Sequence, residues 1–98
     1  MSEIKWKNMV IYPDGFVREF PDPDRDEGYT LEELQEVVGG PIQVVNASNN
    51  RIAVCHEEGK IVGLDYNALA TQVVGEASLL RKDYMVGPVL FCAPEHVQ

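Results

Sequence analysis

The stretch that decides the fold lies in the middle of the chain, where two apolar runs flank a polar turn. It reads Ile42-Gln43-Val44-Val45, then Asn46-Ala47-Ser48-Asn49-Asn50, then Arg51-Ile52-Ala53-Val54-Cys55-His56. Both runs are rich in β-branched residues, which favour strands, and the middle segment is rich in Asn and Ser, which favour turns. We therefore predict a β-hairpin over residues 42–56.

A second hairpin is predicted nearer the N-terminus, over residues 5–20. An apolar run, residues 9–12, is followed by Pro13-Asp14-Gly15, and residues 16–20 then return as a second strand with both apolar and charged side chains. Proline presets φ, aspartate bonds its own backbone and glycine accepts a positive φ, so this tripeptide favours a tight turn.

Two short helices are expected. The first begins at Thr30, because Thr30 and Glu33 have the spacing of a capping box, and it ends at Gly39-Gly40. The second is expected over residues 66–74, with Asp65 as its N-cap.

The remaining segments predict turns and short strands. Residues 57–60 are expected to form a tight turn with Gly59 as its left-handed residue, and residues 61–64 a short extended piece. Residues 84–92 predict a last strand. It is interrupted at Gly87-Pro88, which favours an edge strand or a bulge, because proline cannot donate a ladder bond.

These elements predict one α+β domain over residues 1–98. About five strands in hairpins form a small antiparallel β-sheet or a partly closed barrel, beside two short helices. Residues 21–29 are rich in Pro and Asp and are expected to be an exposed acidic loop. Residues 94–98 are expected to be a frayed tail.

Composition excludes several classes of function. The chain has 16 acidic and 8 basic residues and a formal net charge of −8. Binding to nucleic acid or to anionic membranes needs clustered Lys and Arg, so neither partner is expected. The chain has no apolar run of transmembrane length, and its first residues lack the apolar core of a signal peptide, so we expect a cytoplasmic protein.

No catalytic or metal site is expected. Cys55 and Cys92 lie in apolar runs and are read as buried thiols, because no zinc-type spacing of Cys and His surrounds them. His56-Glu57-Glu58 could support acid–base chemistry, but neighbouring strand residues point to opposite faces, so a strand end and a solvated turn is the simpler interpretation. We predict a protein that is not an enzyme and carries no cofactor.

A candidate ligand site lies in the run from Gly59 to Thr71. Glycines lead into a predicted helix start there, and Asn67 and Thr71 are four residues apart, on one helical face. The alternative is that this pair bonds the local backbone. The predicted ligand-binding residues, which are cationic, aromatic or polar, are Lys60, Tyr66, Asn67, Thr71 and Arg51.

The chain also resembles a known family through three motifs. These are Val38-Gly39-Gly40-Pro41-Ile42-Gln43-Val44-Val45; Glu57-Glu58-Gly59-Lys60 with Gly63-Leu64, Asn67 and Ala70-Thr71; and Asp83-Tyr84-Met85-Val86-Gly87-Pro88-Val89. They resemble a family of small domains of unknown function found in bacteriophages and mobile elements. His56 stands where that family often has Asn.

The resemblance implies a phage-type accessory protein that acts in the host cytoplasm. By analogy with other small phage proteins, it implies a homo-oligomer that counters host defence. The function expected first is binding of a small ligand, such as a nucleotide signal, without catalysis. The alternative is an acidic inhibitor or adaptor that binds a host protein, through Asp22, Asp24, Asp26 and Glu27.

Overall fold

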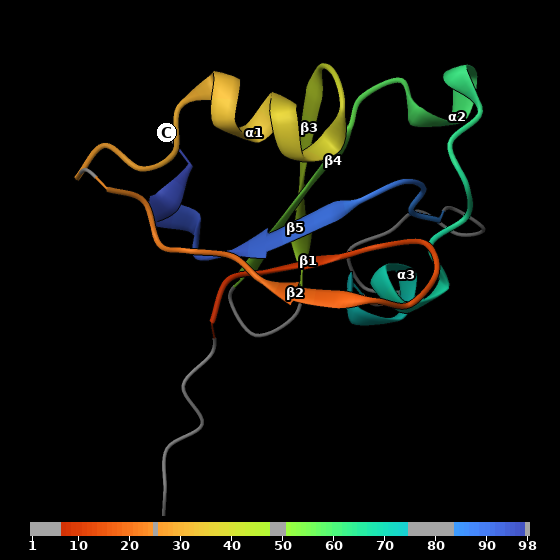
Figure 1. The fold of residues 1–98 in the computed structure, drawn as a ribbon, viewed down its shortest axis with the longest axis horizontal. Coiled ribbons are helices and arrows are strands. Elements are labelled where there is room, and N and C mark those ends of the chain that lie inside the picture. The colour runs from red at the N-terminus through yellow and green to blue at the C-terminus, as the bar shows by residue number, and fades with distance from the viewer. Residues whose placement is uncertain (1–6, 25, 48–50, 75–83, 98) are drawn as a thin grey trace, which may run out of the picture.

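The computed structural model describes residues 7–24, 26–47, 51–74 and 84–97 (Figure 1). The described residues form five strands, three α-helices and one 3₁₀ helix. In chain order they are β1 (Met9–Ile11), β2 (Val17–Glu19), α1 (Leu31–Val38), β3 (Ile42–Ala47), β4 (Arg51–His56), α2 (Gly59–Val62), α3 (Ala68–Val74), β5 (Val89–Cys92) and η1 (Pro94–His96).

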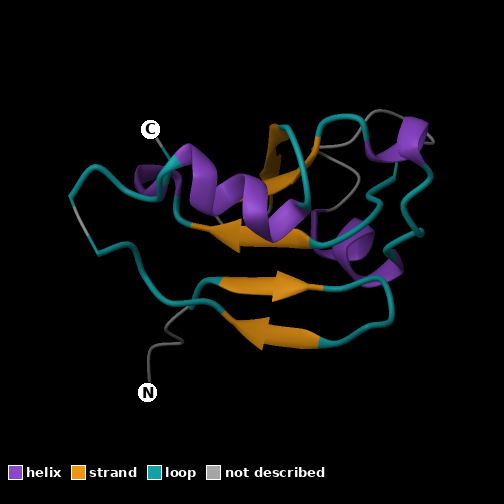
Figure 2. Ribbon diagram, turned by 45° about the horizontal axis from the view of Figure 1, so that its top comes forward, coloured by secondary structure: helices purple, strands orange, loops and turns teal. Residues whose placement is uncertain are grey.

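The five strands make one open antiparallel sheet in the order β2-β1-β5-β4-β3. Both predicted hairpins are present, as β1–β2 and β3–β4. The sheet does not close, so an open sheet replaces the alternative of a partly closed barrel. β5 lies between β1 and β4 and joins the two hairpins (Figure 2).

Alternating side chains along the strands build a core on each face of the sheet. On one face Val10, Val54 and Leu90 pack with Leu34 and Val38 of α1. On the other face the core combines Ala70 and Val74 of α3, Met85 of the segment before β5, and the strand residues Ile11, Ala53, Cys55, Val89 and Phe91. The helices α1 and α3 therefore cover opposite faces of the sheet.

The first helix has the ends that the sequence predicts. The amide of Glu33 donates to the Thr30 side chain at 3.1 Å, and the amide of Thr30 donates to the Glu33 carboxylate at 2.8 Å, so the capping box is complete. Gly39 adopts a left-handed φ of 88°, and its amide donates to the carbonyl of Gln35. Glycine takes this conformation without a steric penalty, which ends the helix.

Two predictions near the second helix were wrong. Residues 59–62 form the short helix α2 rather than a turn and an extended piece, and the left-handed residue is Gly63, with a φ of 83°, rather than Gly59. The residue whose side chain caps α3 is Asn67, which accepts from the amide of Ala70 at 3.0 Å. The carbonyl of Asp65 instead accepts from the amide of Gly87.

The last strand also differs from its prediction. β5 begins at Val89, after Gly87 and Pro88, and it occupies the centre of the sheet rather than an edge. Pro88 is compatible with this place because it precedes the strand and so removes no ladder hydrogen bond within it. Gly87 has a φ of 69°, which turns the chain into the strand.

Residues 94–97 pack against the domain, unlike the frayed tail expected for 94–98, of which Gln98 lies outside the described residues. Pro94–His96 form η1, the carbonyl of His96 accepts from the amide of Tyr29 at 2.8 Å, and Val97 packs on the core.

In the loop after β2, the side chains of Asp22, Asp24, Asp26 and Glu27 are exposed, while Gly28 and Tyr29 are buried. No helix in the described ranges is long and apolar enough to cross a membrane.

Candidate functional site

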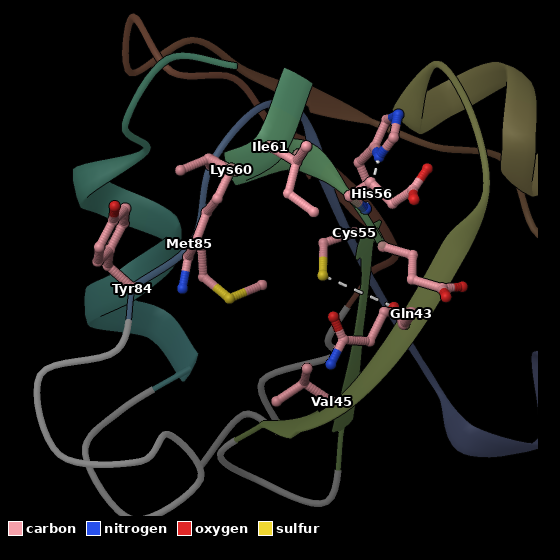
Figure 3. Close-up of a pocket in the computed structure, with 12 residues that line it drawn as sticks. Gln43, Val45, Cys55, His56, Lys60, Ile61, Tyr84 and Met85 are labelled. Carbon is pink, nitrogen blue, oxygen red and sulfur yellow. Dashed lines mark hydrogen bonds between the residues drawn. The ribbon is translucent and has the colours of Figure 1, made fainter. Parts of the chain in front are cut away.

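A pocket of about 260 Å³ opens on the α3 face of the sheet, between the end of the β3–β4 hairpin, α2 and residues 84–86. Cys55 of β4, Ile61 of α2 and Met85 of the segment before β5 point into this space (Figure 3). Gln43 and Val45 of β3 form the opposite wall. Apolar side chains therefore make up the larger part of the pocket surface, and the polar or charged residues Gln43, Glu57, Glu58 and Lys60 also line it.

Asn67 and Thr71 hold one wall of this pocket in place. The Asn67 side chain is fully buried, and its Nδ2 donates to the carbonyls of Ile11 at 2.9 Å and Gly87 at 2.8 Å. The Thr71 hydroxyl donates to the carbonyl of Asn67 at 2.8 Å and accepts from the amide of Met85 at 2.9 Å. Both side chains bond the backbone, which is the alternative that the sequence left open for them.

These contacts fix the segment that carries Tyr84, Met85 and Val86. The amide of Asn67 also donates to the carbonyl of Met85 at 2.9 Å, and Tyr66 forms an isolated β-bridge with Val86. Asn67 has no exposed surface, so its side chain cannot touch a molecule in the pocket. Its hydrogen bonds instead position the backbone that forms the pocket wall.

Lys60 and Tyr66 meet at the rim of the pocket through a third residue, Tyr84. The Lys60 Nζ lies 4.3 Å from the centroid of the Tyr84 ring, and the rings of Tyr66 and Tyr84 make an edge-to-face pair with centroids 5.6 Å apart. Tyr66 is 56% exposed and Tyr84 41% exposed. This cluster presents an accessible aromatic surface with a cation above it.

Arg51 lies away from this cluster. Arg51 is the first residue of β4, whereas the pocket lies at the other end of that strand, near His56. At about 3.4 Å per residue, the two ends of the strand are roughly 17 Å apart. The Arg51 guanidinium donates to Oδ1 of the buried Asn8 at 3.3 Å. The structure therefore does not bring Arg51 to the other predicted ligand residues.

Asn8 is the centre of this second polar cluster. Its Nδ2 lies 2.7 Å from the Tyr29 hydroxyl and 2.9 Å from Nδ1 of His96. The Tyr29 hydroxyl donates in turn to the carbonyl of Pro21 at 2.6 Å. These bonds tie the loop before α1, the start of β1 and the C-terminal residues together.

Two groups at this end of the sheet have raised pKa values. Burial raises the pKa of the Cys92 thiol to about 12, against a smaller lowering effect of Arg51. Burial also raises the pKa of Tyr29 to about 12, partly opposed by its hydrogen bond with Asn8. Both groups are protonated and neutral at physiological pH, as expected for core members.

His56 has a local structural partner. Its Nδ1 accepts from the amide of Glu58 at 3.0 Å, which places the proton of the neutral ring on Nε2. The ring packs against Gly40, where an added Cβ would overlap with Nε2. His56 therefore orders the turn that leads into α2, and Gly40 leaves the space for its ring.

A family model described as "Domain of unknown function (DUF3846)" matches residues 6–97. The chain belongs to the DUF3846 family. This agrees with the resemblance of its motifs to a family of unknown function, and the description of DUF3846 names no activity. No curated protein and no solved structure matches the chain.

Tyr84 is the residue of this candidate site in the DUF3846 domain that sequence reasoning missed. It follows a connecting segment and lies 18 residues after Tyr66 in the chain, so no local spacing links the two tyrosines. The motif around Asn67 could have pointed to it, because a buried Asn that caps α3 also bonds the backbone that follows Tyr84. Among the described residues, no three His, Cys, Asp or Glu side chains form a group that could hold a metal ion.

Proposed function

We propose that this DUF3846 domain binds a small planar ligand, the base of a nucleotide, in the pocket beside Tyr84, and that it does no chemistry on it. The observation that carries the proposal is the Lys60 ammonium 4.3 Å above the Tyr84 ring at the rim of an apolar pocket. A base that stacks on Tyr84 would take the place of the ammonium, and stacking of a base on an aromatic side chain contributes about 1–3 kcal/mol.

The size of the pocket supports a single ring system. Its volume of about 260 Å³ lies below the range of roughly 300–1,000 Å³ that holds drug-sized ligands. A base fits such a space, whereas a whole dinucleotide does not fit inside the pocket of one chain. The sugar and any phosphate of a bound nucleotide would therefore lie outside the rim.

The charges at the rim support the same arrangement. Glu57, Glu58 and Lys60 are among the residues that line the pocket, so two acidic residues and one basic residue lie at it. Carboxylates repel a phosphate but accept hydrogen bonds from the exocyclic amino group of a base. Because Lys60 has a long flexible stem, its ammonium can leave Tyr84 and reach a phosphate outside the pocket.

The biological setting that we propose is a phage accessory protein that sequesters a nucleotide signal of host defence in the host cytoplasm. This part is supported by the sequence resemblance and by analogy, and it needs its own test. Expression of the chain in cells that carry a nucleotide-signalling defence system should protect an infecting phage, and a Tyr84→Ala variant should not protect it.

The binding proposal is tested by thermal unfolding with a panel of bases, nucleosides and linear and cyclic nucleotides. A ligand at about 100 times its dissociation constant should stabilise the fold by roughly 2.7 kcal/mol. Calorimetry on each ligand that shifts the melting temperature then gives its dissociation constant. A panel in which no member shifts the melting temperature would overturn the proposal.

Two variants with matched controls locate the site. Tyr84→Ala should weaken binding by roughly 5- to 150-fold, the equivalent of about 1–3 kcal/mol of lost stacking, whereas Tyr12→Ala, on the β1–β2 hairpin, should not change it. Lys60→Met should weaken binding of nucleotides but not of free bases, whereas Lys7→Met, on the exposed Lys7–Glu19 ion pair, should leave both unchanged. Equal losses in a variant and its control would place the site elsewhere.

One observation favours a second function, that of an acidic inhibitor or adaptor. Asp22, Asp24, Asp26 and Glu27 are all exposed on one loop between β2 and α1. A basic partner would bind them with an affinity that falls with rising salt. A host protein retained by the wild type at low salt, and lost with Asp24→Asn, Asp26→Asn and Glu27→Gln combined, would support this function. Retention that does not depend on salt would count against it.

A further inference from the structure

β3 is an edge strand with an outward row of backbone groups. Among the residues that the structure describes, it pairs with β4 on one side and ends the sheet order on the other. The amide of Glu57 donates to the carbonyl of Pro41, so residues 41 and 57 form a hydrogen-bonded pair. Because such pairs alternate along an antiparallel ladder, the backbone groups of Gln43, Val45 and Ala47 bond β4, and those of Ile42, Val44 and Asn46 point outward.

The two edges of the sheet differ in their protection. At the other edge β2 is three residues long and carries Arg18 and Glu19, and both shortness and charge discourage pairing with another chain. β3 is six residues long and contains no charged residue and no proline, although the whole chain has a net charge of −8. Val44, on the outward row, is 45% exposed. A strand of this kind is a template for another strand.

We propose that β3 pairs in antiparallel fashion with β3 of a second copy of this chain, about a two-fold axis at Val44. In this register Val44 faces Val44 of the other copy, and Ile42 faces its Asn46, so all three outward residues find backbone partners. A second copy fits because its facing strand is also free of charge, whereas most other surfaces of an acidic chain would repel it. The pair would form one ten-stranded sheet.

The pairing has a consequence for the pocket. Gln43 and Val45 form its β3 wall, and in the same register Gln43 lies opposite Val45 of the other copy. The two pockets would then meet across the axis and could hold the two bases of one dinucleotide. This extension rests on the proposed function, whereas the dimer itself rests on β3 alone.

Sedimentation of the wild type and of two charge variants tests the dimer. The wild type should have twice the 11.0 kDa mass of one chain. Val44→Lys and Val44→Glu each place like charges opposite one another at the axis, so each variant should sediment as a single chain. A mixture of the two should recover the dimer, because the charges are then opposite. A wild type that stays monomeric, or a mixture that stays monomeric, would overturn the proposal.

Val17→Lys is the matched control, since Val17 on β2 is 43% exposed and the control should remain dimeric. Circular dichroism and the melting temperature check that each variant is folded. If the charge variants unfold, two other variants replace them. Val44→Thr keeps every outward backbone group and should stay dimeric, whereas Val44→Pro removes an outward amide and should be monomeric. Dimers of Val44→Lys as stable as those of the wild type would show that another surface pairs.

The ligand arm separates the two proposals. If the extension holds, a cyclic dinucleotide should stabilise the wild type more than it stabilises Val44→Lys, whereas a mononucleoside should stabilise both equally. A wild-type dimer that no nucleotide stabilises would keep the dimer and overturn the proposed function. A nucleotide that binds a monomeric wild type would keep the proposed function and overturn the dimer.

Discussion

The Nδ2 of Asn67 lies 2.8 Å from the carbonyl oxygen of Gly87, in a place where the Asn67 side chain has no exposed surface. This contact joins the N-terminus of α3 to the turn that leads into β5. The same amide group also reaches the carbonyl of Ile11 in β1. One side chain therefore connects three parts of the chain that are far apart in sequence.

Asn67→Ala should be strongly destabilising. The variant loses the N-cap of α3, which contributes about 1 kcal/mol, and takes the donor away from two carbonyls, which costs about 1–3 kcal/mol for each group left without a partner. We expect a loss of about 3 kcal/mol or more in the free energy of unfolding, measured by urea titration. Gln72→Ala, at an exposed position of the same helix, should stay within about 0.5 kcal/mol of wild type. A similar small effect of Asn67→Ala would refute the structural role.

Gly40→Ala should be destabilising through His56. The added methyl group would overlap with Nε2 of the histidine ring, and overpacking of this kind costs about 1–3 kcal/mol. In the His56→Ala background the same substitution should cost much less, so a double-mutant cycle should show coupling. Gly39→Ala is the control, because its cost comes from a φ of 88° and not from His56. Additive effects of Gly40→Ala and His56→Ala would contradict the contact.

Stability should fall at alkaline pH because of Cys92. The thiol is neutral when protonated, and its pKa rises from 9.0 in the unfolded chain to about 12 in the folded protein. Its contribution to stability is therefore complete below pH 9 and is lost as the pH rises towards about 12. The unfolding free energy should fall by up to about 1.4 kcal/mol per pH unit for this proton, and less steeply in Cys92→Ala. Identical pH profiles of wild type and variant, from urea titrations, would contradict this.

Removal of the C-terminal residues should destabilise the whole domain. A chain that ends at Ala93 lacks the carbonyl of His96, which accepts from the amide of Tyr29, and the packing of Val97 on the core. Loss of a buried hydrogen bond and of one apolar side chain should lower the unfolding free energy by about 2–4 kcal/mol. A chain that lacks only Gln98 is the control. Equal melting temperatures of the two chains would show that the tail is dispensable.

The hairpins and α1 could be predicted from the sequence because their signals are local. The capping box at Thr30 and the turn residues between the strands act within a few positions of one another. The capping box forms, the Gly15 amide donates to the carbonyl of Tyr12 in the first turn, and β3 pairs with β4 as expected, although residues 48–50 of the second turn lie outside the described residues. The position of β5 could not be predicted in this way. Gly87-Pro88 indicated an edge strand or a bulge, but pairing of β5 with both β1 and β4 depends on contacts distant in sequence.

The candidate site shows the same limit. Asn67 and Thr71 were selected for their helical spacing, but their side chains form hydrogen bonds with backbone groups of Gly87 and Met85. Gly59 stood out as a turn glycine, but its place is set by close approach, since an added Cβ would lie 2.7 Å from Cγ2 of Val86. Lys60 and Tyr66 were predicted from the sequence as ligand-binding residues, and this stays a prediction. Their meeting point, Tyr84, depends on tertiary packing that no local pattern contains.

The central position of β5 in the sheet has a consequence for folding during translation. β5 is the last of the five strands to be synthesised, and it is the one that both hairpins need as a neighbour. Until it emerges, β1 and β4 each expose a row of backbone groups that only a later part of the chain can occupy. The domain therefore cannot fold piece by piece from its N-terminus. During translation, the nascent chain must therefore avoid aggregation through the unpaired edges of its two hairpins until β5 has been synthesised and can pair with both.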